Sequence, residues 1–261
     1  MDFYEEISKA IQSGKSLALC TVIETKGSVP RHAGSKMLVY SDGSHVGSVG
    51  GGEVESKTFI AAQNSIQNSK SVLINFELNQ DDDQSVGLCG GSVRIFIDVI
   101  SQKPKIIVYG AGHVGKAVAQ LAKWLNFQVV VSDDREEFCN QSNIPEADLF
   151  LTMPIESTPN NFEIDQNTYL VLVTRGADVD IKGIPALLRT KAAYIGVIGS
   201  QKRWEFTKKS VLEAGISEIE LLRIKSPIGM DIHAETPEEI AVSIMAEIIL
   251  CRNNPENLRK F

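Results

Sequence analysis

The sequence lacks the short motifs that would assign a chemistry at once. Its four cysteines form no C-x-x-C pair, and neither H-x-H nor H-E-x-x-H occurs, so the ligand spacings typical of zinc sites are missing. No G-x-S-x-G motif occurs, which argues against an α/β-hydrolase. Basic residues are not in excess: the formal net charge is −7, whereas nucleic-acid-binding proteins normally present a basic face.

Long apolar runs are missing as well. The first residues, Met-Asp-Phe-Tyr-Glu-Glu, are too acidic for a signal peptide, and the longest apolar stretches have the length of a strand rather than of a membrane span. The scattered, unpaired cysteines fit a reducing compartment. Together these absences predict a cytoplasmic protein that binds neither nucleic acid nor a membrane.

The remaining composition is that of an ordinary globular protein, with 43% hydrophobic and 23% charged residues among 261. Its pattern changes at Pro104. The residues before it predict helices at 3–13 and 54–66, and strands at 17–25, 36–40, 71–78 and 92–100. The residues after it predict strands at 105–109, 128–132, 149–152, 169–174 and 194–198, alternating with helices at 114–125, 181–191, 201–214 and 237–251.

This change of pattern predicts two domains. Residues 105–261 are expected to form a Rossmann-like α/β domain with a doubly wound parallel sheet, because near-continuous apolar strands suit a sheet that is covered on both faces. Residues 1–101 are expected to form a smaller α+β domain in front of it.

A glycine-rich motif opens the second domain. The apolar strand that begins at Ile106 runs into G-x-G-x-x-G at Gly110, Gly112 and Gly115. In such a turn the first glycine permits the bend, the second lets a diphosphate approach the backbone, and the third lets the helix pack on the sheet. The next predicted strand ends at Asp133, where an acid that binds a ribose hydroxyl is expected.

This pattern predicts binding of a nucleotide or dinucleotide, although a Rossmann domain with an empty site would look the same. Arg135 beside the acid leaves the preference between NAD and NADP open. His113 lies inside the turn, so it either faces the phosphates or is a surface residue at the start of a helix.

Two later loops offer cations at the carboxyl ends of predicted strands. Arg175 follows one strand, and Ser200 and Arg203 follow another, each with a neighbouring glycine, which suits an anionic ligand. Ser200 is expected to cap the next helix. Asp178 and Asp180 are open to two interpretations, as ligand contacts or as helix caps and nothing more.

The first domain has a glycine run of its own. Gly50, Gly51 and Gly52 precede a predicted helix, and three consecutive glycines indicate that a ligand or another backbone approaches closely. A helix start without side chains is a ready site for an anion. Glu53 follows as either a helix cap or a carboxylate that binds or reacts.

Cys89 lies in a third glycine-rich loop, Gly-Leu-Cys-Gly-Gly, and its sulfur is expected to be accessible there. Nearby N–H groups or Arg31 could lower its pKa, and a thiolate binds soft metals and carries sulfur chemistry. The alternative is a small buried residue in a tight turn. The other three cysteines lie in an apolar strand, a loop and a helix end, and are expected to be structural or incidental: Cys20, Cys139 and Cys251.

Six segments, taken in order, carry a family resemblance. They are 27–31 (Gly-Ser-Val-Pro-Arg), 47–53 (Gly-Ser-Val-Gly-Gly-Gly-Glu), 87–91 (Gly-Leu-Cys-Gly-Gly), 110–115 (Gly-Ala-Gly-His-Val-Gly), 194–200 (Tyr-Ile-Gly-Val-Ile-Gly-Ser), and 227–231 (Pro-Ile-Gly-Met-Asp) with 236–241 (Thr-Pro-Glu-Glu-Ile-Ala). Over nearly its whole length, the chain resembles the xanthine dehydrogenase accessory factor family (XdhC/CoxI). The order and joint occurrence of the six segments are specific to this family, whereas each segment alone is not.

The resemblance implies a small N-terminal domain before a Rossmann domain, and a function in handling the molybdenum cofactor. Family members bind this pterin dithiolene, which carries a phosphate and is sometimes extended by a nucleotide, help its sulfuration by a cysteine desulfurase, and deliver it to xanthine dehydrogenase-type enzymes. The glycine loops would then hold the phosphate, and Cys89 would contact molybdenum or a transferable sulfur. Family members are often dimeric; the sequence leaves the oligomeric state open, with a homodimer as one option.

The chain departs from the family pattern at two positions, and two other functions are alternatives to the one that the resemblance implies. The family often has histidine where this chain has Ala177, and usually glycine where it has His233, so a role of the missing histidine does not carry over. A NAD(P)-dependent oxidoreductase would place Asp133 on the ribose, but it leaves Cys89 unexplained, and no Tyr-x-x-x-Lys pair follows the glycine motif. A partner-binding protein with a purely structural Rossmann domain is the other alternative. The sequence favours a cofactor-binding chaperone without turnover of its own.

Overall fold

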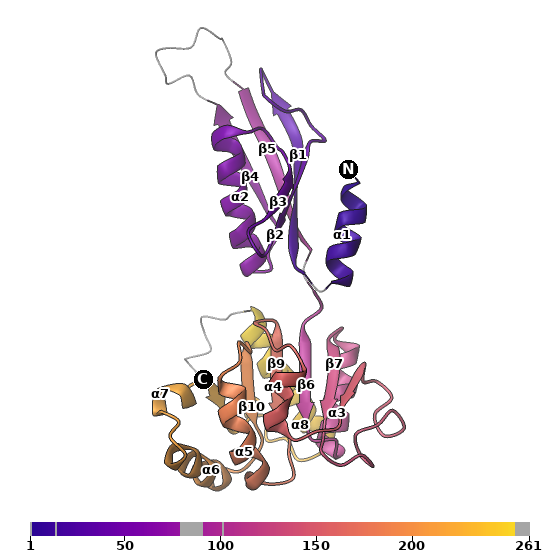
Figure 1. The fold of residues 1–261 in the computed structure, drawn as a ribbon, viewed down its shortest axis with the longest axis vertical. Coiled ribbons are helices and arrows are strands. Elements are labelled where there is room, and N and C mark those ends of the chain that lie inside the picture. Colours follow the sequence, from indigo (N-terminus) through magenta and orange to yellow (C-terminus); the bar gives the residue numbers. More distant parts are fainter. Residues whose placement is uncertain (1, 14, 79–90, 101, 254–261) are drawn as a thin grey trace. The chain divides into compact units, whose positions relative to one another are not determined.

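The computed structural model describes residues 2–13, 15–78, 91–100 and 102–253. The chain divides into two compact units, Met1–Gln102 and Lys103–Phe261, and each is described by itself (Figure 1).

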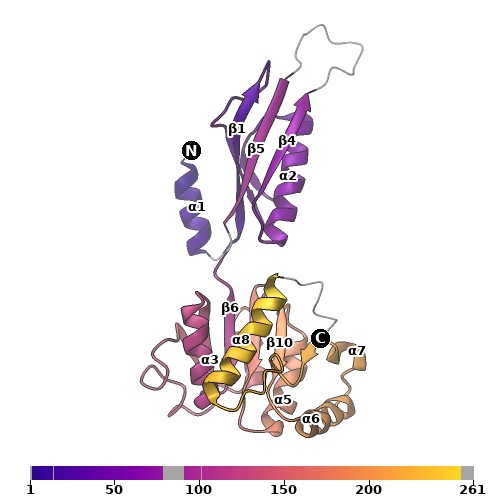
Figure 2. The same ribbon diagram turned by 180° about the vertical axis from the view of Figure 1, so that it is seen from behind.

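The first unit is an antiparallel sheet with a helix on each face. Its strand order is β3-β2-β1-β5-β4. Alternate residues of β1 lie on opposite faces of the sheet. Ala18 and Cys20 face α2 and form a core with Ala62. Leu17 faces the other side, where it packs against Ala10 of α1. Figures 1 and 2 show the two helices on opposite sides of the sheet. The elements are α1 (Phe3–Gln12), β1 (Leu17–Lys26), β2 (Lys36–Tyr40), β3 (His45–Gly47), α2 (Gly52–Gln67), β4 (Val72–Leu78) and β5 (Gly91–Ile100).

The second unit is a parallel sheet in the order β11-β10-β9-β6-β7-β8. The order reverses at β6, since the chain first runs outward through β7 and β8 and then returns to pair β9 with β6. The elements are β6 (Lys105–Tyr109), α3 (His113–Trp124), β7 (Gln128–Ser132), β8 (Leu149–Leu151), η1 (Ile155–Ser157), α4 (Thr158–Asn161), β9 (Thr168–Leu172), α5 (Ala177–Leu188), β10 (Tyr194–Val197), α6 (Gln201–Glu213), α7 (Glu218–Leu221), β11 (Ile224–Lys225) and α8 (Pro237–Asn253).

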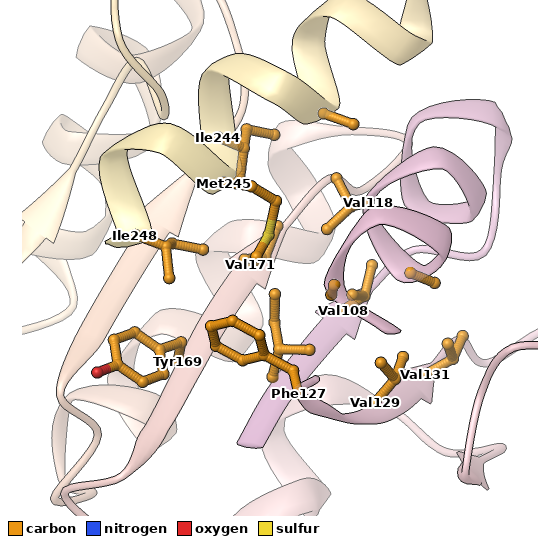
Figure 3. Close-up of a cluster of buried hydrophobic side chains, with 14 of the residues drawn as sticks. Val108, Val118, Phe127, Val129, Val131, Tyr169, Val171, Ile244, Met245 and Ile248 are labelled. Atoms are coloured by element: carbon orange, nitrogen blue, oxygen red, sulfur yellow. The ribbon is translucent and has the colours of Figure 1, made fainter. Parts of the chain in front are cut away.

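Separate cores lie on the two faces of this sheet. One contains residues of α3 and α8, and Figure 3 shows Met245 and Ile248 of α8 on the side of Phe127 and Tyr169, whose ring centroids are 5.8 Å apart. The other contains residues of α5, α6 and α7. Helices therefore cover both faces, which confirms the predicted doubly wound α/β fold after a smaller α+β unit.

The start of helix α5 that the sequence pattern predicted is wrong. The predicted helix begins at residue 181, whereas the observed one begins at Ala177 with Gly176 as its N-cap. Asp178 and Asp180 lie in the first turn, where the positive end of the helix dipole favours carboxylates. Five short elements had no periodic signal and were not predicted from the sequence: β3, η1, α4, α7 and β11.

His233 adopts a left-handed backbone conformation, with φ at 55°, and its side chain is almost fully exposed. This conformation costs a residue with a Cβ about 1–2 kcal/mol, and glycine avoids that cost. We expect His233→Gly to raise the free energy of unfolding by about 0.5–1 kcal/mol, since glycine's greater freedom in the unfolded chain offsets part of the gain. Urea unfolding measures this change.

The matched control is His113→Gly, at a helical position, which should lower stability by about 0.5 kcal/mol. Equal losses in the two variants would show that the backbone at His233 is unstrained.

Candidate functional site

The three motif glycines of the second unit have different surroundings. Gly110 has a φ of 111°, and a Cβ there would lie 2.5 Å from the carbonyl oxygen of Val173. A Cβ on Gly115 would overlap the carbonyl oxygen of Gly110. Gly112 differs, because no described atom lies within 4 Å of a Cβ built on it. The first and third glycines therefore permit close packing, whereas the second leaves the turn open.

The start of α3 is open to an anion. Gly112 is its N-cap, and no side chain of the described residues caps the helix there. The first N–H groups of a helix have no partner within the helix, and together with the helix dipole they attract negative charge. His113, the first helical residue, is exposed beside this turn.

Asp133 binds the turn and Arg135 at the same time. Its Oδ2 accepts a hydrogen bond from the N–H of Ala111 at 2.9 Å and from Nη2 of Arg135 at 2.8 Å, and its Oδ1 accepts from N and Nε of Arg135. Burial acts to raise the pKa of Asp133, but these bonds outweigh it and lower the pKa. Both oxygens are thus engaged, so a ribose hydroxyl would have to displace Arg135.

Arg175 is also engaged. Its two terminal nitrogens donate to the two oxygens of Asp134 at 2.6 and 3.0 Å, which connects the loop after β9 to the loop after β7. This pairing lowers the pKa of Asp134. Both side chains remain more than two-fifths exposed, so a competing anion can reach the pair from solvent.

Arg203 forms part of a buried network that the sequence did not predict. Its Nη2 lies 2.5 Å from Oδ2 of Asp180, whose side chain is fully buried, and 2.9 Å from Oγ1 of Thr174. Thr174 in turn donates to Asp180 at 2.6 Å. Burial raises the pKa of Asp180, against the opposing effect of both hydrogen bonds. Ser200 is the N-cap of α6, as predicted, and accepts from the N–H of Arg203 at 3.3 Å.

A cavity of about 160 Å³ lies at the carboxyl ends of β6, β7 and β9. Gly110, Asp133 and Arg175 line it, together with Ser132, whose buried Oγ has no hydrogen-bond partner in the described structure. The cavity lies where the strand order reverses, which is the usual ligand position in this fold. Its described lining does not include five of the predicted site residues: Gly112, His113, Gly115, Ser200 and Arg203.

In the first unit, the carboxylate that binds the glycine run belongs to Glu55 and not to Glu53. Gly50, Gly51 and Gly52 have φ values of 158°, 71° and 56°. The N–H of Gly51 donates to Oε2 of Glu55 at 3.3 Å, and the hydroxyl of Ser48 donates to the same oxygen. Glu53 points into solvent, where it pairs with Lys57 at 2.7 Å. Both acids lie in the first turn of α2, so the sequence alone did not distinguish them.

The described residues of the family motifs in the first unit lie close together. A Cβ built on Gly50 would lie 3.5 Å from Cγ of Pro30, in the loop at 27–34. A Cβ on Gly91 would lie 2.5 Å from the carbonyl oxygen of Ser28, in the same loop. Gly91 ends the third motif, and Cys89 of that motif lies outside the described residues.

Comparison with known proteins assigns both units. The model of the XdhC Rossmann domain matches residues 106–248, and the model of the XdhC and CoxI family matches residues 10–77. The chain belongs to the XdhC and CoxI family. Among the described residues no helix is both long and apolar enough to cross a membrane, and no three His, Cys, Asp or Glu side chains gather to hold a metal ion.

Curated relatives match nearly the whole of this chain. An uncharacterized protein YqeB of Escherichia coli is 31% identical over 97% of this chain, which spans only 47% of YqeB. A protein of Bacillus subtilis described as a probable xanthine dehydrogenase subunit is 26% identical, with 96% of this chain and 98% of the relative covered. The molybdenum cofactor insertion chaperone PaoD of E. coli is 23% identical, with 95% and 87% covered.

A solved structure shows the same fold. The crystal structure of a protein described as a xanthine dehydrogenase from Bacillus halodurans superposes with a TM-score of 0.52, covers 95% of both chains and is 22% identical. At this identity the similarity concerns the fold alone.

Proposed function

We propose that this protein is an accessory factor of a xanthine dehydrogenase-type molybdoenzyme, which binds the molybdenum cofactor, assists its sulfuration and delivers it. The observation that carries the proposal is the family match over both units, together with the names of two relatives, a molybdenum cofactor insertion chaperone and a probable xanthine dehydrogenase subunit. The protein would act by binding and transfer rather than by turnover. The three cysteines that the structure describes are unpaired, which fits action in the cytoplasm.

The chemistry of the glycine loops fits a cargo that carries phosphate. The open turn at Gly112 offers unshielded N–H groups of α3 to a phosphate or diphosphate. Gly50, Gly51 and Gly52 form a second loop, next to the other motifs of the first unit. In this proposal His113 would contact an anion at the turn.

A NAD(P)-dependent oxidoreductase is less well supported. The turn itself suits a dinucleotide, but Asp133 already accepts four hydrogen bonds. The cavity of about 160 Å³ is also small beside the about 300–1,000 Å³ typical of ligand pockets.

The experiment that tests the function is a reconstitution. The apo-form of a xanthine dehydrogenase-type enzyme, free molybdenum cofactor and a cysteine desulfurase are combined with and without this protein. We expect the protein to raise the yield of active enzyme severalfold. An equal yield without it would refute the accessory role.

Cys89 is the cysteine best suited to sulfur or molybdenum chemistry. The other three, Cys20, Cys139 and Cys251, are buried. Burial raises the pKa of Cys20 to about 12 and that of Cys251 to about 11, so neither forms the thiolate that reacts.

We therefore expect Cys89→Ala to weaken retention of the cofactor about tenfold, as the loss of one strong contact predicts, while the far-ultraviolet circular dichroism stays unchanged. The cofactor that elutes with the protein on gel filtration is the readout. Cys139→Ala, which removes a buried thiol from the second unit, is the control. Equal retention by both variants would assign Cys89 a purely structural role.

A further inference from the structure

The first unit contains a large hollow away from its glycine run. It is a wide, open depression of about 830 Å³. It lies between the start of α1, the loop that leads into β2, and the end of β3. The residues that line it are Asp2, Phe3, Tyr4, Arg31, Gly34, Ser35, Lys36, Gly47 and Ser48.

Two cations face this hollow with little to neutralise them. The exposed side chain of Arg31 makes no hydrogen bond or ion pair within the part of the chain that the structure describes. Lys36 donates through Nζ to the carbonyl oxygen of Gly34 at 3.2 Å, which leaves its charge unbalanced. Asp2, the acidic residue of the lining, accepts from the N–H of Tyr4 as the N-cap of α1. In a chain with a net charge of −7, this lining is positive.

Aromatic rings lie beside the cations. The side chain of Tyr4 is 70% exposed at the rim. The ring of Phe3 rests on Gly47, where a Cβ would lie 2.8 Å from Cζ of that ring and 2.5 Å from the carbonyl oxygen of Lys36. Gly47 also has a φ of 88°, so contact and backbone conformation both require glycine. The hollow thus combines oxyanion donors with a surface on which a planar ring can stack.

We propose that this hollow binds a phosphorylated planar heterocycle, with Arg31 and Lys36 on the phosphate and Tyr4 on the ring. The inference rests on the proposed function, because the pterin phosphate of the molybdenum cofactor is a ligand of this class. It assigns the pterin to the first unit, and it leaves the open turn at Gly112 to a nucleotide. Of the three cations that line the cavity of the second unit, Arg135, Arg175 and Lys182, the two arginines are already paired with acids.

Retention of pterin by the full-length protein tests this assignment. Molybdenum cofactor released from a molybdoenzyme is mixed with each variant, and the pterin that elutes with the protein on gel filtration is quantified by fluorescence. Loss of both charge-assisted contacts in Arg31→Ala/Lys36→Ala should weaken binding about 100-fold or more. Added salt should weaken wild-type binding and affect the double variant less. Tyr4→Ala should weaken it about tenfold, and Tyr4→Phe should restore it, because the ring rather than the hydroxyl makes the contact.

Two controls give the outcomes distinct meanings. Lys70→Ala removes a surface charge outside the hollow and should bind normally. Lys209→Ala removes a surface charge from the second unit and should also retain the pterin. If the Arg31→Ala/Lys36→Ala variant binds like wild type, or if either control loses the pterin as strongly as that variant does, the hollow is not the site, although the proposed function stands. If wild-type protein retains no pterin, the proposed function itself fails.

Discussion

Gly115→Ala is expected to lower the free energy of unfolding of the second unit by about 2 kcal/mol. The new Cβ would overlap the carbonyl oxygen of Gly110, a backbone atom that no change of rotamer can move. Strand β6 and helix α3 would therefore have to separate. Alanine is the better helix former by about 1 kcal/mol, which is less than the cost of this overlap.

Urea unfolding followed by tryptophan fluorescence measures the loss, because both tryptophans, Trp124 and Trp204, lie in the second unit. The matched control is Gly112→Ala, in the same turn. With φ at −78° and open space around its Cβ, this variant should change stability by less than about 0.5 kcal/mol. Equal losses in the two variants would contradict the distinct roles of these glycines.

Arg203→Met is expected to destabilise the second unit by about 3 kcal/mol at pH 8. The substitution keeps an unbranched apolar side chain but leaves the buried carboxylate of Asp180 without its ion-pair partner. Removal of one partner of a buried pair costs about 3–5 kcal/mol, and we use the lower end because Arg203 is one-quarter exposed. The exposed pair of Asp134 and Arg175 is the control, since Arg175→Met should cost less than about 1 kcal/mol.

The loss should shrink as the pH falls. The folded-state pKa of Asp180 is already raised by burial above its usual 3.8, and without Arg203 it should rise further. Between the unfolded and the folded pKa the folded state binds more protons, so stability increases as the pH decreases through this window. Asp180→Asn combined with Arg203→Met should recover part of the stability at pH 8. A loss that stays the same from pH 8 to pH 5 would show that Asp180 is not the source.

The features that the sequence predicted well depend on neighbours in the chain. The turn from Gly110 to Gly115 joins a strand directly to a helix, so three glycines at fixed spacing were enough to predict its shape. The cap of α6 at Ser200 likewise uses the N–H of a residue three positions later. Hydrophobic pattern similarly predicted the doubly wound sheet, because its central strands β6, β9 and β10 are buried on both faces.

The features that the sequence did not predict depend on contacts between distant segments. Arg203 and Asp180 lie on different helices, 23 residues apart, and Arg175 reaches Asp134 across 41 residues. Arg175 and Arg203 looked like free cations for a ligand because nothing in their local sequence indicates these partners. Arg31 was considered as a neighbour of Cys89 and as the end of one family motif, since the hollow it lines forms from three separate segments.

The most direct test of the account is a binding comparison on the full-length wild-type protein. Molybdenum cofactor and NAD(P)H are offered in separate samples, and the bound pterin and the bound nicotinamide are quantified after gel filtration, with hydride transfer followed by absorbance. We predict that pterin elutes with the protein in near-stoichiometric amount and that no hydride transfer occurs. Tight binding of NAD(P)H with hydride transfer, and no retained pterin, would contradict the account.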